Sequence, residues 1–300
     1  MLCYNPILRF AINQQEIYQL FRVRSLFLFV FVLSLGASIS MGQETPPRQD
    51  PAVAVKKEEP KPTATPTAFD PTKPLTAEQL VEVASIVYGG GGGRATLNQI
   101  RKTTFERGRL KAMNAEGKME TGTYQRWVLR GETLSKERIR FDQDLPGGRF
   151  SLINNSEKVF GLAGNTYFAP RADVAKAFDN ANFRSLEAFI RSKENESKVV
   201  LAGKEKILGV EYHLVDVTDK QGRSTRFFVS VKSFRVMMLT YEEDGIKYRR
   251  KFYNHNLAQG TLVPYRTTLT ADDKLIEESE IGTITFGQRV DEELFKENVQ

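Results

Sequence analysis

Residues 202–270 decide the fold: AGKEKILGVEYHLVDVTDKQGRSTRFFVSVKSFRVMMLTYEEDGIKYRRKFYNHNLAQGTLVPYRTTLT. The stretch is rich in β-branched and aromatic residues, and turn signals such as Gln221-Gly222 and Asp244-Gly245 divide it. This pattern predicts antiparallel strands joined by short turns. The predicted strands are 210–217, 225–231, 234–241, 246–253 and 263–270. Since no intervening segment can hold the helical crossover of a parallel sheet, the core should be a large antiparallel sheet.

The same type of pattern occurs earlier in the chain. It predicts strands over 103–113, 117–129, 134–142, 148–153, 158–162 and 167–170. Between the two sets of strands, residues 173–193 carry apolar side chains at helical spacing, which predicts one or two amphipathic helices. We expect these helices to lie across the concave face or mouth of a curved sheet.

A short helix should precede the first strand. Thr76-Ala-Glu-Gln79 has the pattern of a capping box and predicts a helix over 80–88. Five glycines, Gly89 to Gly93, then end it. They do not predict a phosphate-binding loop, because the Gly-Lys-Ser/Thr ending is absent and the preceding element is a helix rather than a strand.

Several segments together resemble a known family. They are 203–212 (GKEKILGVEY), 217–219 (VTD), 227–230 (FFVS), 259–265 (QGTLVPY) and 281–295 (IGTITFGQRVDEELF). In their order and spacing the chain resembles the periplasmic outer-membrane lipoprotein-sorting proteins related to LolA and LolB. The resemblance covers roughly residues 75–295. It implies a mostly β (α+β) domain over 75–300, in which a large curved antiparallel sheet forms an unclosed β-barrel with short helices over its concave face.

The N-terminal region predicts export. Arg22 and Arg24 precede an apolar run over 26–36 and then small residues, which is the layout of a secretory signal. The run is short for a membrane span of about 20 residues. We therefore expect a signal peptide over 1–42 and a periplasmic location, with an uncleaved N-terminal anchor in the inner membrane as the alternative.

A linker should follow the signal. Residues 43–74 hold eight of the 12 prolines and few large apolar side chains. Such a segment cannot bury enough surface to offset its conformational entropy. We expect residues 43–74 to be a disordered, proline-rich linker.

Charge and cysteine usage exclude several functions. The net charge of +6 comes from 43 basic and 37 acidic residues that are interspersed, without the basic run typical of nucleic-acid binding. Nucleic acid is therefore not an expected partner. The single cysteine, Cys3, precedes the apolar run, so it cannot be the acylated cysteine of a lipoprotein. The exported part would contain no thiol for a disulfide or a cysteine-based metal site.

No motif predicts catalysis. His213 and His255 are far apart and lack metal-ligand spacing. The acidic clusters 242–244 and 277–280 are interpreted as solubilising charges at a turn and along an edge strand. The Gly-x-Ser-x-Gly elbow of serine hydrolases is absent. We expect no enzyme activity, no metal and no cofactor.

The strands carry apolar side chains on both faces, and this suggests a ligand. Strands apolar on both faces must be covered on both, either by a filled core or by a bound lipid. The predicted cavity lining is Trp127, Phe150, Phe160, Phe228, Val236, Met238, Phe252 and Leu269, with Phe178, Phe189 and Ile190 as a lid. A register shift of one residue would move each strand residue to the opposite face.

The resemblance implies a carrier function. The protein would shield the acyl chains of a lipid or an acylated lipoprotein in the periplasm, with envelope membrane proteins as further partners. The alternative is a non-catalytic periplasmic sensor or protein-interaction domain on the same scaffold.

Overall fold

The computed structural model describes residues 74–297. The predicted signal over 1–42 lies outside the described residues, and so does the predicted linker over 43–74 except for Pro74. In the described part, no helix combines the length and the apolar character needed to cross a membrane.

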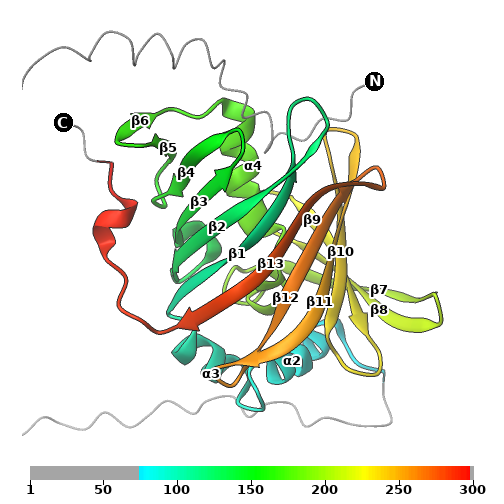
Figure 1. Cartoon of the computed structure of the whole chain (residues 1–300). Coiled ribbons are helices and arrows are strands. Elements are labelled where there is room, and N and C mark those ends of the chain that lie inside the picture. Colours follow the sequence, from blue (N-terminus) through cyan, green and yellow to red (C-terminus); the bar gives the residue numbers. More distant parts are fainter. Residues whose placement is uncertain (1–73, 298–300) are drawn as a thin grey trace, which may run out of the picture. The chain divides into compact units, whose positions relative to one another are not determined.

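Thirteen strands form a single antiparallel sheet (Figure 1). The first set is β1 (Thr103–Met113), β2 (Met119–Leu129), β3 (Arg138–Leu145), β4 (Gly148–Asn154), β5 (Val159–Ala163) and β6 (Thr166–Phe168). The second set is β7 (Lys198–Ile207), β8 (Val210–Thr218), β9 (Ser224–Ser230), β10 (Val236–Glu243), β11 (Ile246–Ala258), β12 (Thr261–Ala271) and β13 (Lys274–Phe286).

The strand order is β6-β5-β4-β3-β2-β1-β13-β12-β11-β10-β9-β8-β7. Each set is a meander, and the first strand pairs with the last in the middle of the sheet. Because β6 and β7 are free edges, the sheet is not closed. The predicted mostly β fold, with an open antiparallel sheet and few short helices, is confirmed.

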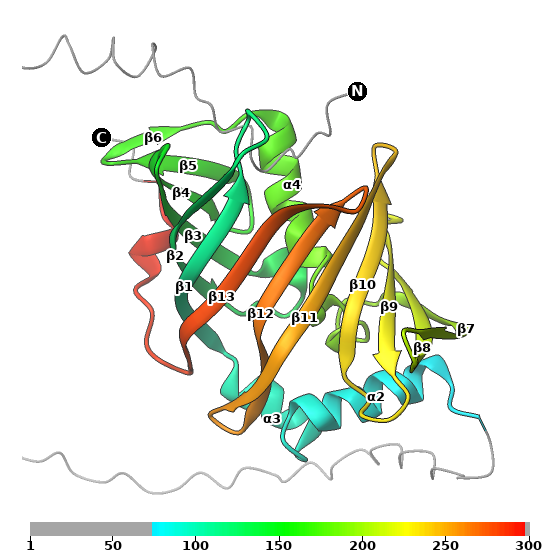
Figure 2. The same cartoon turned by 45° about the vertical axis from the view of Figure 1, so that its right-hand side comes forward.

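The helices are short. They are α2 (Ala77–Tyr88), α3 (Gly93–Ile100), α4 (Ala172–Phe183) and α5 (Leu186–Ile190), with 3-10 turns η2 (Leu134–Lys136) and η3 (Glu292–Phe295). Figures 1 and 2 show α4 on the inner side of the curved sheet and α2 and α3 across one end of it. The predicted capping box at Thr76 and Gln79 is present.

One glycine of the run after α2 has a specific packing role. Gly90 has a φ of +60°, and a Cβ atom there would lie 2.1 Å from the carbonyl oxygen of Gly260, in the turn between β11 and β12. The side-chain-free backbone therefore lets the end of α2 approach this turn closely.

Two strand assignments differ from the expectation. The strand β7 was not predicted, and it is the exposed edge next to β8. The acidic segment containing Glu277 to Glu280 belongs to β13, which was expected to be an edge strand but lies between β1 and β12. Glu278 and Glu280 therefore form cross-strand ion pairs with Lys111, Arg109 and Arg266 instead of protecting an edge.

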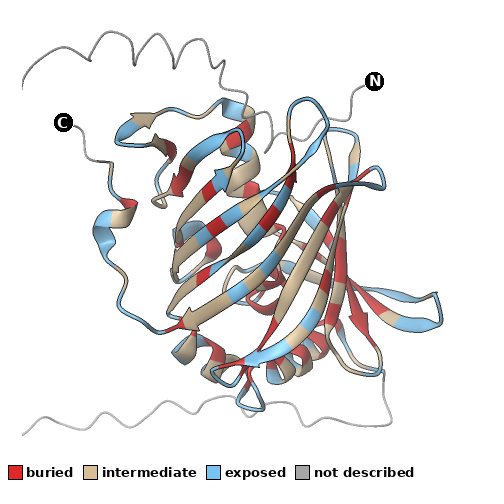
Figure 3. Cartoon of the chain, in the orientation of Figure 1, coloured by how far each residue is buried: buried red, intermediate tan, exposed pale blue. Residues whose placement is uncertain are grey.

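The main core lies between the helices and the inner face of the second meander (Figure 3). Leu80, Ala84 and Tyr88 of α2 pack with Phe189 of α5 and with inward side chains such as Phe227. The rings of Phe189 and Phe227 lie 5.0 Å apart. Burial of these side chains fixes both helices against the sheet.

The C-terminal segment covers part of the outer face. Phe295 of η3 is 1% exposed and packs with Ile153 and Phe160, and Trp127 lies beside this cluster. Residues 287–297 thus form a strap over β2–β5. We call this segment the C-terminal strap.

Candidate functional site

A cavity of about 270 Å³ lies on the concave side of the sheet, between the strands and the α4–α5 region. Strands from both meanders and the central β13 contribute to its wall. The apolar wall residues are Leu110, Val128, Ile139, Phe141, Leu152, Phe178, Ala181, Leu186, Phe252, Val263, Pro264, Ile281, Ile284 and Phe286. The cavity is therefore enclosed by side chains that are more than 100 positions apart in the sequence.

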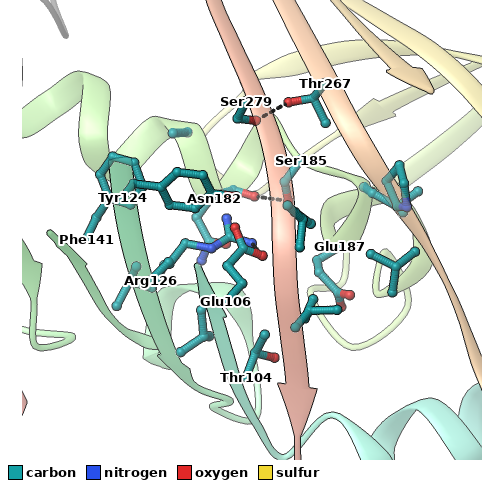
Figure 4. A pocket seen from close by; sticks show the side chains of 18 of the residues that line it. Thr104, Glu106, Tyr124, Arg126, Phe141, Asn182, Ser185, Glu187, Thr267 and Ser279 are labelled. Carbon is teal, nitrogen blue, oxygen red and sulfur yellow. Dashed lines mark hydrogen bonds and ion pairs between the residues drawn. The ribbon is translucent and has the colours of Figure 1, made fainter. Parts of the chain in front are cut away.

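Alternation along the strands explains which side chains reach the cavity. On β2, Tyr124, Arg126 and Val128 line it, whereas Gln125 and Trp127 point to the other face. Because opposite residues in an antiparallel pair share a face, the Glu106–Arg126 pair places both charged side chains inward. Figure 4 shows the Arg126 side chain extending toward the Glu106 carboxylate.

The cavity wall is charged as well as apolar. Four arginines (101, 126, 130 and 250) and four glutamates (106, 137, 187 and 277) line it. Arg126 Nη2 lies 2.9 Å from Glu106 Oε2, and Arg250 Nη2 lies 3.6 Å from Glu277 Oε1. The lining thus differs from the wholly apolar one expected from the sequence, because charged pairs share the inward face with the aliphatic and aromatic side chains.

Glu187 links two of these arginines. Its carboxylate lies 2.8 Å from Arg101 Nη1 and 3.1 Å from Arg130 Nη1. Burial by itself would raise the pKa of the Glu187 carboxyl, but Arg101 and Arg130 hold that pKa below its usual value. Glu187 therefore stays ionised and ties the start of α5 to the residues that flank β1 and β2.

Glu137 is held by a buried arginine behind the wall. Arg191 Nη1 donates to the Glu137 carboxylate, and Asn182 Nδ2 donates to the same carboxylate at 3.0 Å. Burial raises the pKa of the Glu137 carboxyl, and the attraction of Arg191 opposes this effect. These contacts join α4 and the end of α5 to the segment that begins β3.

The structure places three of the eleven predicted site residues in or beside the cavity. Phe178 and Phe252 line it. Leu269 belongs to the inner-face cluster that also contains the lining residues Leu110 and Tyr124. The other eight predicted residues lie elsewhere in the described domain.

Four of these eight are on the inner side of the sheet. Val236, Phe189 and Ile190 belong to the core cluster with α2. Phe150 lies on β4 opposite the cavity-lining Gln143 and is half-buried. These residues share the cavity's face of the sheet but are absent from its wall.

The remaining four are in outer-face clusters. Trp127 and Phe160 lie beneath the C-terminal strap. Phe228 and Met238 pack with Leu214 in a separate cluster. A bulge in β10 between Val236 and Met238 interrupts the alternation, so these two side chains face opposite sides.

The histidines are not brought together. His213 stacks on Phe234 with ring centroids 6.5 Å apart, whereas His255 Nε2 lies 3.4 Å from the Tyr88 hydroxyl. Burial, with a smaller effect of Arg235, lowers the pKa of His255 to about 4. Over residues 74–297, no three His, Cys, Asp or Glu side chains are grouped to hold a metal ion.

The protein, an open antiparallel sheet that curves around short helices, has the fold of solved LolA superfamily structures. Its structure is similar to that of a LolA superfamily protein from Nitrosomonas europaea, with 10% identity and a TM-score of 0.51 over 75% of this chain and 99% of that chain. It is likewise similar to a Vibrio parahaemolyticus domain classed as an outer membrane lipoprotein-sorting protein, with 13% identity and a TM-score of 0.51 over 73% of this chain and 97% of that chain.

A DUF1329 family protein from Desulfovibrio piger is similar to the same degree, with 11% identity and a TM-score of 0.51 over 74% of this chain and 97% of that chain. No protein-family model matches the sequence, and no curated protein matches it. At these identities the likeness concerns the fold. At that level it confirms the predicted resemblance to the lipoprotein-sorting proteins.

Proposed function

We propose that the protein is a non-catalytic carrier that binds an acyl chain of a lipid or lipoprotein in the concave-side cavity. The observation that carries the proposal is the cavity itself, with fourteen apolar side chains on its wall inside an open sheet. The superfamily fold is consistent with this function. No cofactor is needed, because burial of each CH₂ group contributes roughly 0.8 kcal/mol.

The cavity volume limits the cargo. Small-ligand sites usually measure about 300–1,000 Å³, and the volume here is about 270 Å³. Its size suits a single acyl chain better than several. A larger cargo would need the wall to move.

Helix α4 is the part of the wall best suited to move. Phe178 and Asn182 face the cavity from this helix. Within α4 itself only Val174 and Asn180 are buried. An outward displacement of residues 172–183 would open the cavity at a modest cost in buried surface, so α4 is the proposed lid, whereas the buried side chains of Phe189 and Ile190 hold α5 in place.

The proposed location is the periplasm. It depends on the predicted signal over 1–42 and the predicted linker over 43–74. An acylated lipoprotein or a lipid, together with envelope membrane proteins that deliver or accept it, would be the partners.

The test is native mass spectrometry and solvent extraction of the full chain purified from the periplasm without detergent. A carrier should retain an acylated molecule at close to one per protein. A protein that is empty, and that also fails to bind added fatty acids, fatty alcohols and acylated peptides, would contradict the carrier proposal.

A second candidate, a protein-interaction domain, is favoured by the β7–β8 hairpin. Leu208 at its tip is 98% exposed, and Val200 and Val210 on the two strands are 43% and 44% exposed. Because β7 is a sheet edge, an extended segment of a partner protein could add as a further strand. In that case a Leu208→Asp, Val210→Asp double variant would lose partner binding while retaining any bound acyl chain.

A further inference from the structure

Arg126 is a charged residue of the cavity wall that uses little of its hydrogen-bonding capacity. A guanidinium has five N–H donors. Within residues 74–297, Arg126 donates a single hydrogen bond, from Nη2 to Glu106 Oε2 at 2.9 Å. Its Nε is buried and has no partner among the same residues. The side chain nevertheless keeps 43% of its surface accessible, although it lies inside the domain, so that surface faces the cavity.

A second arginine on the same wall, Arg250, also has hydrogen-bond donors without an acceptor. Arg250 lies 3.6 Å from Glu277 Oε1, which is beyond hydrogen-bond distance, and its buried Nε lacks a partner in the described part of the chain. Leaving a buried donor unsatisfied costs about 1–3 kcal/mol. Because both Nε atoms are closed off from the cavity, an acceptor group inside it would meet the accessible Nη1 of Arg126 instead.

The other two arginines of the wall do not offer donors in this way. Arg101 donates to Glu187 and to the carbonyl of Leu262 at 2.8 Å each. Arg130 donates to Glu187 at 3.1 Å and to Asn98 at 2.9 Å. The unused donors are therefore concentrated at Arg126 and Arg250.

The charge balance around the cavity favours an anion. Four arginines and four glutamates line the wall. Glu137 is paired with Arg191, which lies behind the wall, so these nine groups have a net charge of +1. The wall can accept one negative charge without an excess of carboxylates.

We propose that the natural ligand is an amphiphile with one acyl chain and an anionic head, of the fatty-acid class, and that Arg126 binds the head inside the cavity. Its carboxylate accepts hydrogen bonds from the free Nη donors of Arg126, in the charge-assisted geometry that suits arginine. Its chain lies against Phe141, Leu152 and Phe178. The inference rests on the proposed carrier function and names its ligand class.

The experiment compares laurate with dodecanol, which has the same chain and no charge, by calorimetric titration of the full-length protein. Dodecyl phosphate, as a third ligand, distinguishes a carboxylate from a phosphate head. We expect laurate to bind at least about ten-fold more tightly than dodecanol, because hydrogen bonds to a charged group are stronger than neutral ones. Tighter binding of dodecyl phosphate than of laurate would overturn the fatty-acid assignment.

Two variants should change the affinity for laurate in opposite directions, one by removing the Arg126 guanidinium and one by removing the carboxylate that competes for it. Arg126→Gln should weaken laurate binding by about 10- to 100-fold and leave dodecanol binding unchanged. Glu106→Gln should strengthen laurate binding several-fold, because it removes the competing carboxylate. Arg109→Gln is the matched control, since Arg109 is on the neighbouring strand but points outward with 72% of its side chain exposed. It should bind both ligands as the parent does.

The outcomes separate this inference from the carrier proposal. Binding of laurate and dodecanol with equal affinity, or unchanged laurate binding by Arg126→Gln, would overturn the anion site and leave the carrier function standing. If neither ligand nor an acylated peptide binds, the carrier function itself fails. If Arg126→Gln does not fold, Glu106→Gln decides the question, and unchanged or weaker laurate binding by that variant overturns the inference.

Discussion

Replacing Arg191 by methionine should destabilise the domain strongly. Arg191 is 1% exposed and donates from Nη1 to the Glu137 carboxylate and from Nη2 to the carbonyls of Gly131 and Glu132 at 2.6 and 3.2 Å. Methionine fills much of the same volume but leaves Glu137, which is 4% exposed, as a buried unpaired carboxylate. Breaking a buried pair in this way costs about 3–5 kcal/mol.

Urea unfolding at pH 7 measures the decrease in the free energy of unfolding. Trp127 is the only tryptophan and packs against Phe105 at 5.2 Å on the outer face, so its emission reports unfolding. The control is Arg109→Met, because Arg109 and Glu280 form an exposed pair at 2.8 Å. Exposed pairs contribute about 0–1 kcal/mol, so this variant should be close to the parent.

The pH dependence of the stability loss tests whether the unpaired Glu137 carboxylate causes it. Without Arg191, burial should hold the folded-state pKa of Glu137 well above the unfolded value of 4.5. The variant's deficit should therefore be largest above that raised pKa and shrink as the pH falls below 4.5, where the carboxyl is protonated in both states. A loss under about 1 kcal/mol at pH 7, or one equally large at pH 4, would refute the reasoning.

Three further perturbations follow from the structure. Val128→Phe should occupy part of the cavity and weaken dodecanol binding by about ten-fold or more with little change in stability, whereas unchanged binding in calorimetry would place the ligand elsewhere. His255→Gln should reduce the loss of stability between pH 6.5 and about 4, because the unfolded histidine takes up a proton over this range and the buried one does not. Urea midpoints at pH 7 and 4.5 measure this, and equal losses in variant and parent would contradict it. Phe295→Ala should cost about 3 kcal/mol and speed amide exchange over 287–297. Parent-like exchange would show that Phe295 does not hold the C-terminal strap.

The meanders could be predicted because their signals are local. Turns such as Asp244-Gly245 and the alternation between them define most strands within a few residues. The strand β7 was missed because its residues are mostly exposed, and the charged run 204–206 interrupts any apolar alternation. The placement of β13 in the centre of the sheet depends on its pairing with β1. A local sequence pattern cannot predict pairing between strands so far apart in the chain.

The cavity wall was harder to predict than the fold. Counting alternate residues along 234–241 puts Val236 and Met238 on one face of the sheet, but the β10 bulge places them on opposite faces. The residue types in this segment do not predict a bulge. Arg126 could have been found, since it shares the inward phase of β2 with Tyr124 and Val128. The sequence-based prediction of the lining considered only apolar side chains. It therefore omitted charged residues that point to the same face of a strand.

The pairing of β1 with β13 has a consequence for how the chain reaches its native state. Thr104 pairs with Phe286, 182 positions later, whereas strands within each meander pair with immediate neighbours. Closing so long a loop is entropically costly and slow compared with forming hairpins. Each meander can form early, but the two can join only after β13 has emerged from the ribosome and, if the chain is exported, crossed the membrane. Until then β1 and β12 each present an unpaired edge, and this is the interval in which the chain is most exposed to aggregation.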